Sequence, residues 1–404
     1  MCGSDARAAG DEVSAQARED DGAWLPFAPP PAKPVGICLI DSGVSENPDT
    51  TTQLVERTAL DGGDPNDVSP IEHGTLMAME AGAPPNGWGM IGAAPGAVRV
   101  VSVRAESAGD SLTFRAYKQA IVECQGLAER RPELDVKVIS MSIGFQTAPS
   151  EEQLAQLADA ASSARTSGLD LVAAAGDEGA SALSYPAAVT PILSVGAYGE
   201  GHIPCPFSSG GEAAAILAPG CALTEASPAT GAPLHEYAGT SQATAIVAAV
   251  LGALRAYEPE LSPAAAEELL TTTARASSGL DVAALFQAAG LSYLVETGRL
   301  SEPAPPESPA PARPAARRSG LRELPPPRVR LVHRERQWVL RLLNLPHEAT
   351  ATVRVARRAG ATTRLRLLTR HPILRFRARG PLTVTVIYRA GAHASSSTSV
   401  VRTR

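Results

Sequence analysis

The feature that most constrains the fold is an alternation of short apolar runs with alanine-rich, amphipathic stretches between residues 35 and 290. The apolar runs are nearly continuous and rich in β-branched residues, which is typical of parallel strands that are buried on both faces. They occupy residues 35–41, 98–104, 136–142, 169–175, 192–195 and 215–218. We therefore predict an α/β fold with a predominantly parallel sheet flanked by helices.

Four segments between these runs have helical periodicity, namely 112–130, 150–167, 242–257 and 262–275. Two of them begin with residues that favour a helix start. Ser150 precedes two glutamates, and Ser262 precedes a proline. A serine side chain can accept a hydrogen bond from the first helical turn, so both residues are predicted to cap their helices.

Composition divides the chain into four parts. Residues 1–34 are polar and then proline-rich, and they are predicted to be a tail. Residues 35–300 form the α/β domain, and 301–327 are a Pro/Ala/Arg segment that we expect to be an extended linker. Residues 328–404 contain about seven short β-patterned runs. This spacing predicts a small all-β sandwich of immunoglobulin or fibronectin type.

Charge and hydropathy limit the partners. The formal net charge is −6, but the segment after residue 300 is strongly basic, with arginine and no lysine. Alternating arginines on strands usually form a solvated face, so nucleic acid is not an expected partner, although an anionic polymer is an alternative for this segment. No run of apolar residues reaches the ~18 needed to span a bilayer, so we expect no transmembrane segment.

Five cysteines are present, an odd and sparse set that does not define a disulfide scaffold. Cys38 and Cys124 lie in apolar or helical patterns and are predicted to be small buried residues. Cys205 and Cys221 would form a disulfide if their Cα atoms approach to about 6 Å. The start Met1-Cys2-Gly3-Ser4 resembles a mature bacterial lipoprotein, which makes Cys2 a candidate lipid anchor; an ordinary N-terminus is the alternative.

Three segments supply the groups that hydrolyse peptide bonds at neutral pH: a hydroxyl, a base and a carboxylate that orients the base. Asp41 ends an apolar strand, His73 opens a helical segment, and Ser241 precedes a long apolar helix. Each residue alone has an ordinary structural explanation. Asp41 can be a strand end, His73 can pair with Glu72 on the surface, and Ser241 can be a helix cap.

The order Asp41, His73, Ser241 resembles that of the subtilisin-like (subtilase) family. Further blocks in family order strengthen the resemblance, which covers about residues 35–290. They include Val138-Ile139-Ser140-Met141-Ser142-Ile143-Gly144, Leu171-Val172-Ala173-Ala174-Ala175-Gly176-Asp177, Tyr185-Pro186-Ala187, Phe207-Ser208-Ser209 and Ala218-Pro219-Gly220. The resemblance implies a serine endopeptidase that forms an acyl-enzyme through a triad of Asp41, His73 and Ser241.

The resemblance also implies the parts of the cleft. A polypeptide substrate would bind as an added β-strand between two backbone walls. The walls would be formed by Ser142, Ile143 and Gly144 on one side and by Ala174, Ala175 and Gly176 on the other. Asp177 and the N–H of Ser241 would form the oxyanion hole.

Asp177 is a departure, because most of the family has an asparagine there. An ionised carboxylate offers no donor to the oxyanion, whereas a protonated one does. We therefore expect slow turnover at neutral pH and faster turnover in acid. A pseudoprotease that binds peptides or acts as a scaffold is the alternative function.

No cofactor or metal site is expected from the residues. Calcium is common in the family, and segment 61–67 contains three aspartates, but a solvated turn explains it better. The family and Cys2 together suggest a secreted or cell-envelope bacterial protein, with a cytoplasmic location as the alternative.

Overall fold

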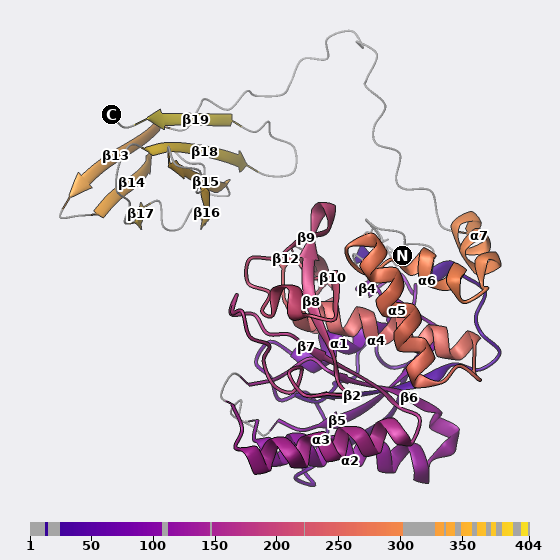
Figure 1. The fold of residues 1–404 in the computed structure, drawn as a ribbon. Coiled ribbons are helices and arrows are strands. Elements are labelled where there is room, and N and C mark those ends of the chain that lie inside the picture. Colours follow the sequence, from indigo (N-terminus) through magenta and orange to yellow (C-terminus); the bar gives the residue numbers. More distant parts are fainter. Residues whose placement is uncertain are drawn as a thin grey trace, which may run out of the picture. The chain divides into compact units, whose positions relative to one another are not determined.

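The computed structural model describes residues 13–14, 25–106, 112–145, 148–221, 223–301 and seven strand segments within 328–402. It consists of two compact units, Met1–Pro305 and Pro306–Arg404 (Figure 1). Almost all of the expected linker 301–327, and most of the expected tail 1–34 including Cys2, lie outside the described residues. The domain boundaries therefore stay predictions.

The first unit is built around one large sheet with the strand order β10-β8-β7-β6-β2-β5-β3, and β9 pairs with β8 at its side. All pairs along this path are parallel, while β9 is antiparallel to β8. The strands are β2 (Val35–Asp41), β3 (Leu54–Ala59), β5 (Val98–Arg104), β6 (Val136–Met141), β7 (Asp170–Ala174), β8 (Leu193–Gly199), β9 (Ile203–Pro204) and β10 (Ile216–Pro219). The predicted α/β class and parallel sheet are confirmed.

Helices cover both faces of this sheet (Figure 1). On one face, α2 (Phe114–Arg130) and α3 (Glu151–Thr166) pack against Cys38 and Ile40 of β2. On the other face, α4 (Thr240–Tyr257) packs against Ile37, and α1 (His73–Gly82) packs against Leu39. Successive residues of β2 thus point into cores on opposite faces of the sheet, which explains why the strand is apolar up to Asp41.

The two predicted helix starts are confirmed. The Ser150 hydroxyl accepts a hydrogen bond from Gln153 N–H, and the Gln153 side chain accepts one from Ser150 N–H, which forms a capping box at α3. The Ser262 hydroxyl caps α5 (Pro263–Ser277) through Ala265 N–H. The α/β unit ends with α6 (Val282–Ala288) and α7 (Ser292–Ser301).

Smaller pairs complete the first unit. β1 (Val13–Ser14) pairs in parallel with β4 (Met90–Ile91), and β11 (Leu223–Ala226) pairs antiparallel with β12 (Pro233–Tyr237). In the part of the chain that the structure describes, no helix is both long and apolar enough to cross a membrane.

The second unit contains only strands among its described residues. One antiparallel sheet has the order β13-β14-β17 and the other has the order β16-β15-β18-β19. The strands are β13 (Arg328–Arg334), β14 (Gln337–Leu343), β15 (Ala349–Arg357), β16 (Thr362–Leu368), β17 (Ile373–Phe376), β18 (Leu382–Ala390) and β19 (Ser397–Arg402). The immunoglobulin or fibronectin type stays a prediction.

The parallel sheet determines where polar side chains from different strands come together. Strands β2, β6 and β7 are neighbours, and their carboxyl ends point to the same edge. Polar groups at this edge of a parallel sheet face a common crevice. Asp41 ends β2, Ser142 follows β6, and Gly176 and Asp177 follow β7.

Candidate active site

Asp41 and His73 are in direct contact at this edge. His73 Nδ1 lies 2.7 Å from Asp41 Oδ1, and Asp41 is almost completely buried. The backbone N–H of Ser42 also donates to Oδ1 at 2.8 Å. Asp41 therefore orients the imidazole, and the other ring nitrogen, Nε2, is left for proton transfer.

Two glycines allow close backbone contacts around the end of β2 and the start of α1. Gly43 has φ 104°, and a Cβ there would lie 2.4 Å from the Asn66 carbonyl oxygen. A Cβ at Gly74 would lie 2.1 Å from the carbonyl oxygen of Gly43. A larger residue at Gly74 would separate α1 from the end of β2, and one at Gly43 would collide with the backbone of residues 65–66. The glycines after Asp41-Ser42 and after His73 therefore each have a steric reason.

The surroundings of His73 favour its protonated form. Burial lowers the pKa of His73, but the charge and hydrogen bond of Asp41, helped by the charges of Asp67 and Glu106, more than offset this and leave the pKa raised. A base must be neutral to accept a proton. This raised pKa works against the faster turnover in acid that Asp177 led us to expect from the sequence.

Ser241 is the second residue of α4, and Gly239 rather than Ser241 is the helix cap. The Ser241 hydroxyl donates to the Ser142 carbonyl oxygen at 2.6 Å, and the Ser142 hydroxyl donates to the Ser241 carbonyl oxygen at 3.1 Å. The two residues are 99 positions apart in sequence. This pair of bonds attaches the start of α4 to the end of β6.

A cleft of about 400 Å³ opens over these groups. Its described lining consists of His73, Glu106, Leu112, Ser142, Ile143, Gly144, Phe145, Ala174, Gly176, Asp177, Glu178, Ser184, Thr240 and Ser241. The structure thus brings the base, the hydroxyl and five of the six predicted wall residues to one cavity. Ala175 is not part of the lining; its side chain is fully buried, and its N–H donates to Val195 O.

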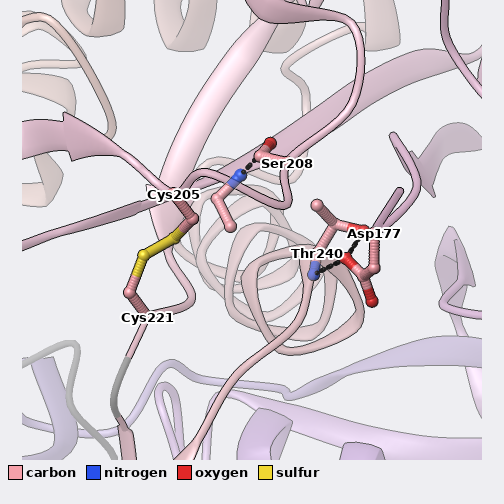
Figure 2. Close-up of a disulfide and its surroundings, with 6 residues drawn as sticks. Asp177, Cys205, Ser208, Cys221 and Thr240 are labelled. Carbon is pink, nitrogen blue, oxygen red and sulfur yellow. Dashed lines mark hydrogen bonds between the residues drawn. A yellow bond between two sulfur atoms is a disulfide. The ribbon is translucent and has the colours of Figure 1, made fainter. Parts of the chain in front are cut away.

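Asp177 faces the start of α4 (Figure 2). Its Oδ1 accepts hydrogen bonds from the Thr240 N–H at 2.8 Å and from the Thr240 hydroxyl at 2.9 Å. The Thr240 Oγ1 in turn accepts from Gly176 N–H at 3.2 Å. Oδ1 is therefore an acceptor, and Oδ2 is the oxygen on which a proton would have to lie for Asp177 to donate to an oxyanion.

Asp67 is a site residue that we did not predict. Its Oδ1 accepts from the Ser42 hydroxyl at 2.8 Å, and its Oδ2 accepts from the N–H and hydroxyl of Thr75 at 2.7 and 2.8 Å. Asp67 thus joins the residue after Asp41 to the first turn of the His73 helix. The sequence showed it only as one of several acidic residues in segment 61–67, because nothing local reveals contacts to both Ser42 and Thr75.

The other aspartates of that segment also have protein partners. Asp61 forms a salt bridge with Arg104 at 2.5 Å, and Asp64 accepts from Asn66 N–H at 2.9 Å. In the described ranges, no group of three or more His, Cys, Asp or Glu side chains is arranged to hold a metal ion. The expectation from the sequence that segment 61–67 is a solvated turn and not a calcium site stays a prediction.

The pairing of Cys38 and Cys124 differs from our prediction, which treated them as two separate buried residues. Cys38 of β2 and Cys124 of α2 are fully buried as predicted, but they form a disulfide, with 5.8 Å between the Cα atoms. They meet because α2 packs on the face of the sheet to which Cys38 points. Cys205 and Cys221 are also bonded, with 6.0 Å between the Cα atoms (Figure 2).

Comparison with known proteins agrees with this geometry. The model of the subtilase family matches residues 32–292. The chain is 31% identical to the M-protease of Shouchella clausii (strain KSM-K16) over 241 residues, which is 59% of each chain. It is 30% identical to Subtilisin BL of Lederbergia lenta over 244 residues, covering 59% of this chain and 83% of the relative. The chain thus spans about three fifths of M-protease.

A solved structure described as a protease from Pseudoalteromonas arctica PAMC 21717 has a TM-score of 0.56 and 23% identity, and the match covers 68% of this chain and 96% of that one. At this identity the match shows the fold alone, and it agrees with the parallel sheet and flanking helices. The family match spans the residues that carry the cleft. The chain belongs to the subtilase family of serine peptidases.

Proposed function

We propose that this chain is a serine endopeptidase that hydrolyses polypeptides through Asp41, His73 and Ser241. The observation that carries the proposal is the 2.7 Å contact between Asp41 Oδ1 and His73 Nδ1, at a cleft that is lined by both His73 and Ser241. A buried carboxylate on one ring nitrogen fixes the imidazole tautomer, so that the other nitrogen can act as the base.

The first chemical step forms an acyl-enzyme. The Ser241 hydroxyl turns from the Ser142 carbonyl oxygen toward His73 Nε2, gives its proton to that nitrogen, and attacks the scissile carbonyl carbon. His73 then passes the proton to the leaving amine, and the C–N bond breaks. A water molecule, activated by the same His73, hydrolyses the ester and restores the Ser241 hydroxyl.

The developing oxyanion needs donors in the cleft. Ser241 lies in the first turn of α4, so its backbone N–H has no acceptor within the helix and can donate to the oxyanion. The positive end of the helix dipole adds to this effect. Asp177 supplies a second donor only when Oδ2 is protonated.

Substrate binding is assigned to the two walls. The segment after β6, with Ser142, Ile143 and Gly144, lines the cleft on one side. On the other side the lining consists of Ala174 at the end of β7 and Gly176 just after it. An extended peptide between them would gain backbone hydrogen bonds as an added strand. Ala175 supports the second wall from within the core instead of contacting substrate.

We place the protein outside the reducing cytoplasm, in the cell envelope or secreted. The two disulfides support this location, because such bonds persist mainly in oxidising compartments. They use four of the five cysteines and leave Cys2 as the thiol available for lipid attachment. Detection of Cys2 by mass spectrometry as an unmodified residue in membrane-free protein would exclude the anchor.

Hydrolysis of an unstructured protein such as casein tests the proposal. Ser241→Ala should lower kcat about 10⁶-fold, the loss measured in subtilisin itself, a member of the same family. Ser162→Ala, which changes an exposed serine on α3, is the matched control and should leave the rate unchanged. The alternative, a pseudoprotease, rests on Asp177 alone, and it predicts no hydrolysis by the unmodified chain.

A further inference from the structure

Two carboxyl groups are buried in the core outside the cleft. Glu80 of α1 and Glu225 of β11 are both completely buried, and their carboxylate oxygens have no hydrogen-bond partner within the described residues. Neither residue belongs to the described lining of the cleft. Burying an ionised carboxylate without a partner costs much free energy, so two such groups in one core call for an explanation.

The packing of three elements brings these carboxyls together with Gln242 of α4. One buried cluster joins the three elements, and it contains Met77 of α1, Ala226 of β11 and Ala245 of α4. Glu80 lies three positions after Met77, and Gln242 lies three positions before Ala245, so both are on the helix faces that form the cluster. Burial and the charge of Glu80 raise the pKa of Glu225 well above its ordinary range, and the Gln242 side chain lowers it in part. All three side chains therefore lie close together.

No positive charge neutralises the two carboxyls in the part of the chain that the structure describes. The elements α4, β2, β4 and β5 pack against α1, and their charged residues are Asp41 on β2, Arg99 and Arg104 on β5, and Arg255 on α4. None of these residues is among the groups that shift the pKa of Glu80 or Glu225. On the other side, Glu225 lies opposite the apolar Leu234 of β12. Two neighbouring carboxyls in such surroundings cannot both ionise at neutral pH, so together they keep a proton.

Gln242 connects the two carboxyls to the start of α4. It directly follows Ser241, and its Oε1 would lie 2.5 Å from a Cβ built on Gly239, the cap of the helix. Asp177 Oδ2 would lie 3.2 Å from the same Cβ. The Gln242 amide thus reaches the first turn of α4, next to the carboxylate that binds Thr240. A displacement of Glu225 would be passed to this turn, and a displacement of Glu80 would be passed to the helix that begins with His73.

We propose that Glu80 and Glu225 are positioning residues, and that the proton they share holds α1 and the first turn of α4 in the arrangement that lets His73 accept the proton of Ser241. The inference rests on the proposed peptidase function and adds two residues to it. When both carboxyls ionise, their repulsion separates the elements that carry them, and proton transfer slows. The walls of the cleft stay unchanged, so the effect is expected in kcat and not in KM.

The pH dependence of kcat tests the proposal, at pH values where circular dichroism shows that the chain is folded. Burial raises the pKa of Glu80 to about 8. At pH 9 only about a tenth of the molecules keep the shared proton, so kcat should be about 10-fold below its maximum while KM is unchanged. Glu80→Gln and Glu225→Gln each leave one carboxyl beside an amide that can donate to it, so both variants should keep their maximal kcat at pH 9.

Asp159→Asn, at an exposed position of α3, is the control and should show the same alkaline fall as the unmodified chain. Infrared spectroscopy follows the proton without an activity assay. The unmodified chain should lose a carboxylic acid C=O band as the pH rises from 7 to 9, and Glu80→Gln should lack this change.

Three results overturn the inference while the peptidase function stands. They are an unmodified chain whose kcat does not fall in alkali, an alkaline fall that both glutamine variants keep, and an infrared spectrum of the unmodified chain that does not change between pH 7 and 9. Failure of the unmodified chain to hydrolyse casein at any pH contradicts the peptidase function itself.

Discussion

Asp177 and Thr240 are joined by two hydrogen bonds that both end on the same carboxylate oxygen. The N–H and the hydroxyl of Thr240 donate to Oδ1, and Oδ2 is not used in this contact. Thr240 directly precedes Ser241, so the carboxylate supports the first turn of α4, the helix that carries Ser241. The same side chain thus has a structural role through Oδ1, and it also lines the cleft together with Ser241.

Asp177→Asn should therefore raise activity without disturbing α4. An asparagine can keep its carbonyl oxygen on Thr240 and place its NH₂ group where Oδ2 now lies, which adds an oxyanion donor. Such a donor is worth about 10²-fold to 10³-fold in kcat, a value measured in subtilisin itself. Steady-state kinetics at pH 8 test this expectation, with Asp159→Asn on the exposed side of α3 as the control. An unchanged or lower kcat would show that Asp177 does not face the oxyanion.

The pH profile should show an acid limb that is set by His73. Because the net effect of its surroundings raises the pKa of His73 above 6.5, kcat/KM should fall as the pH drops through a midpoint above that value. Asp67→Asn removes one of the negative charges that stabilise the imidazolium, so the midpoint should move to lower pH. Activity that rises steadily from pH 7 to pH 5 would contradict this prediction and favour a dominant role for the protonation of Asp177.

Stability should decrease in alkali because of Glu80. This residue of α1 is fully buried, its carboxylate oxygens have no hydrogen-bond partner in the described structure, and burial raises its pKa to about 8. Burial, together with the charge of Glu80, also raises the pKa of Glu225 well above its ordinary range. The folded state therefore binds more protons than the unfolded state above about pH 4.5, so the free energy of unfolding falls as the pH rises toward 8.

Glu80→Gln tests this directly by thermal melting between pH 5 and 9. The neutral amide has no proton to lose, so the Tm of the variant should exceed that of the unmodified chain at pH 9 and differ little at pH 5. Asp159→Asn should follow the unmodified chain throughout. Equal Tm values for Glu80→Gln and the unmodified chain at pH 9 would show that Glu80 does not limit stability in alkali.

The Cys38 to Cys124 disulfide should stabilise the fold more than the other. It closes a separation of 86 residues, whereas the Cys205 to Cys221 bond closes 16. Loop-closure entropy predicts losses in the free energy of unfolding of about 4 to 5 kcal/mol and about 3 kcal/mol when each pair is replaced by alanine. Guanidinium unfolding measures both, and alkylation without a reductant checks the pairing. Modification of Cys38 in unreduced, unfolded protein would exclude the first bond.

The sequence predicted the buried parts of the sheet well. The bounds of β2 and β5 match the predicted runs, because these central strands are buried on both faces and the apolar pattern is unbroken. The sequence Leu-Val-Glu-Arg-Thr-Ala of β3 was missed, because it is an edge strand whose residues are all half-buried. No apolar run marks such a strand.

The residues of the site could be predicted where each one lies at an element boundary that the local sequence reveals. Asp41 and His73 stand at a strand end and a helix start, and this was visible in the sequence. The contacts of Asp67 with Ser42 and Thr75, and of Cys38 with Cys124, depend on which elements pack together. Such long-range pairs leave no local pattern, so the structure was needed to find them.

Labelling with a fluorophosphonate probe tests whether His73 activates the Ser241 hydroxyl, because the probe modifies only a serine that an adjacent base activates. We predict one probe adduct per chain, on the peptide that contains Ser241, with loss of labelling in Ser241→Ala and in His73→Ala and no loss in Ser162→Ala. No labelling of the folded, unmodified chain between pH 5 and 9, or an adduct on another serine, would contradict it.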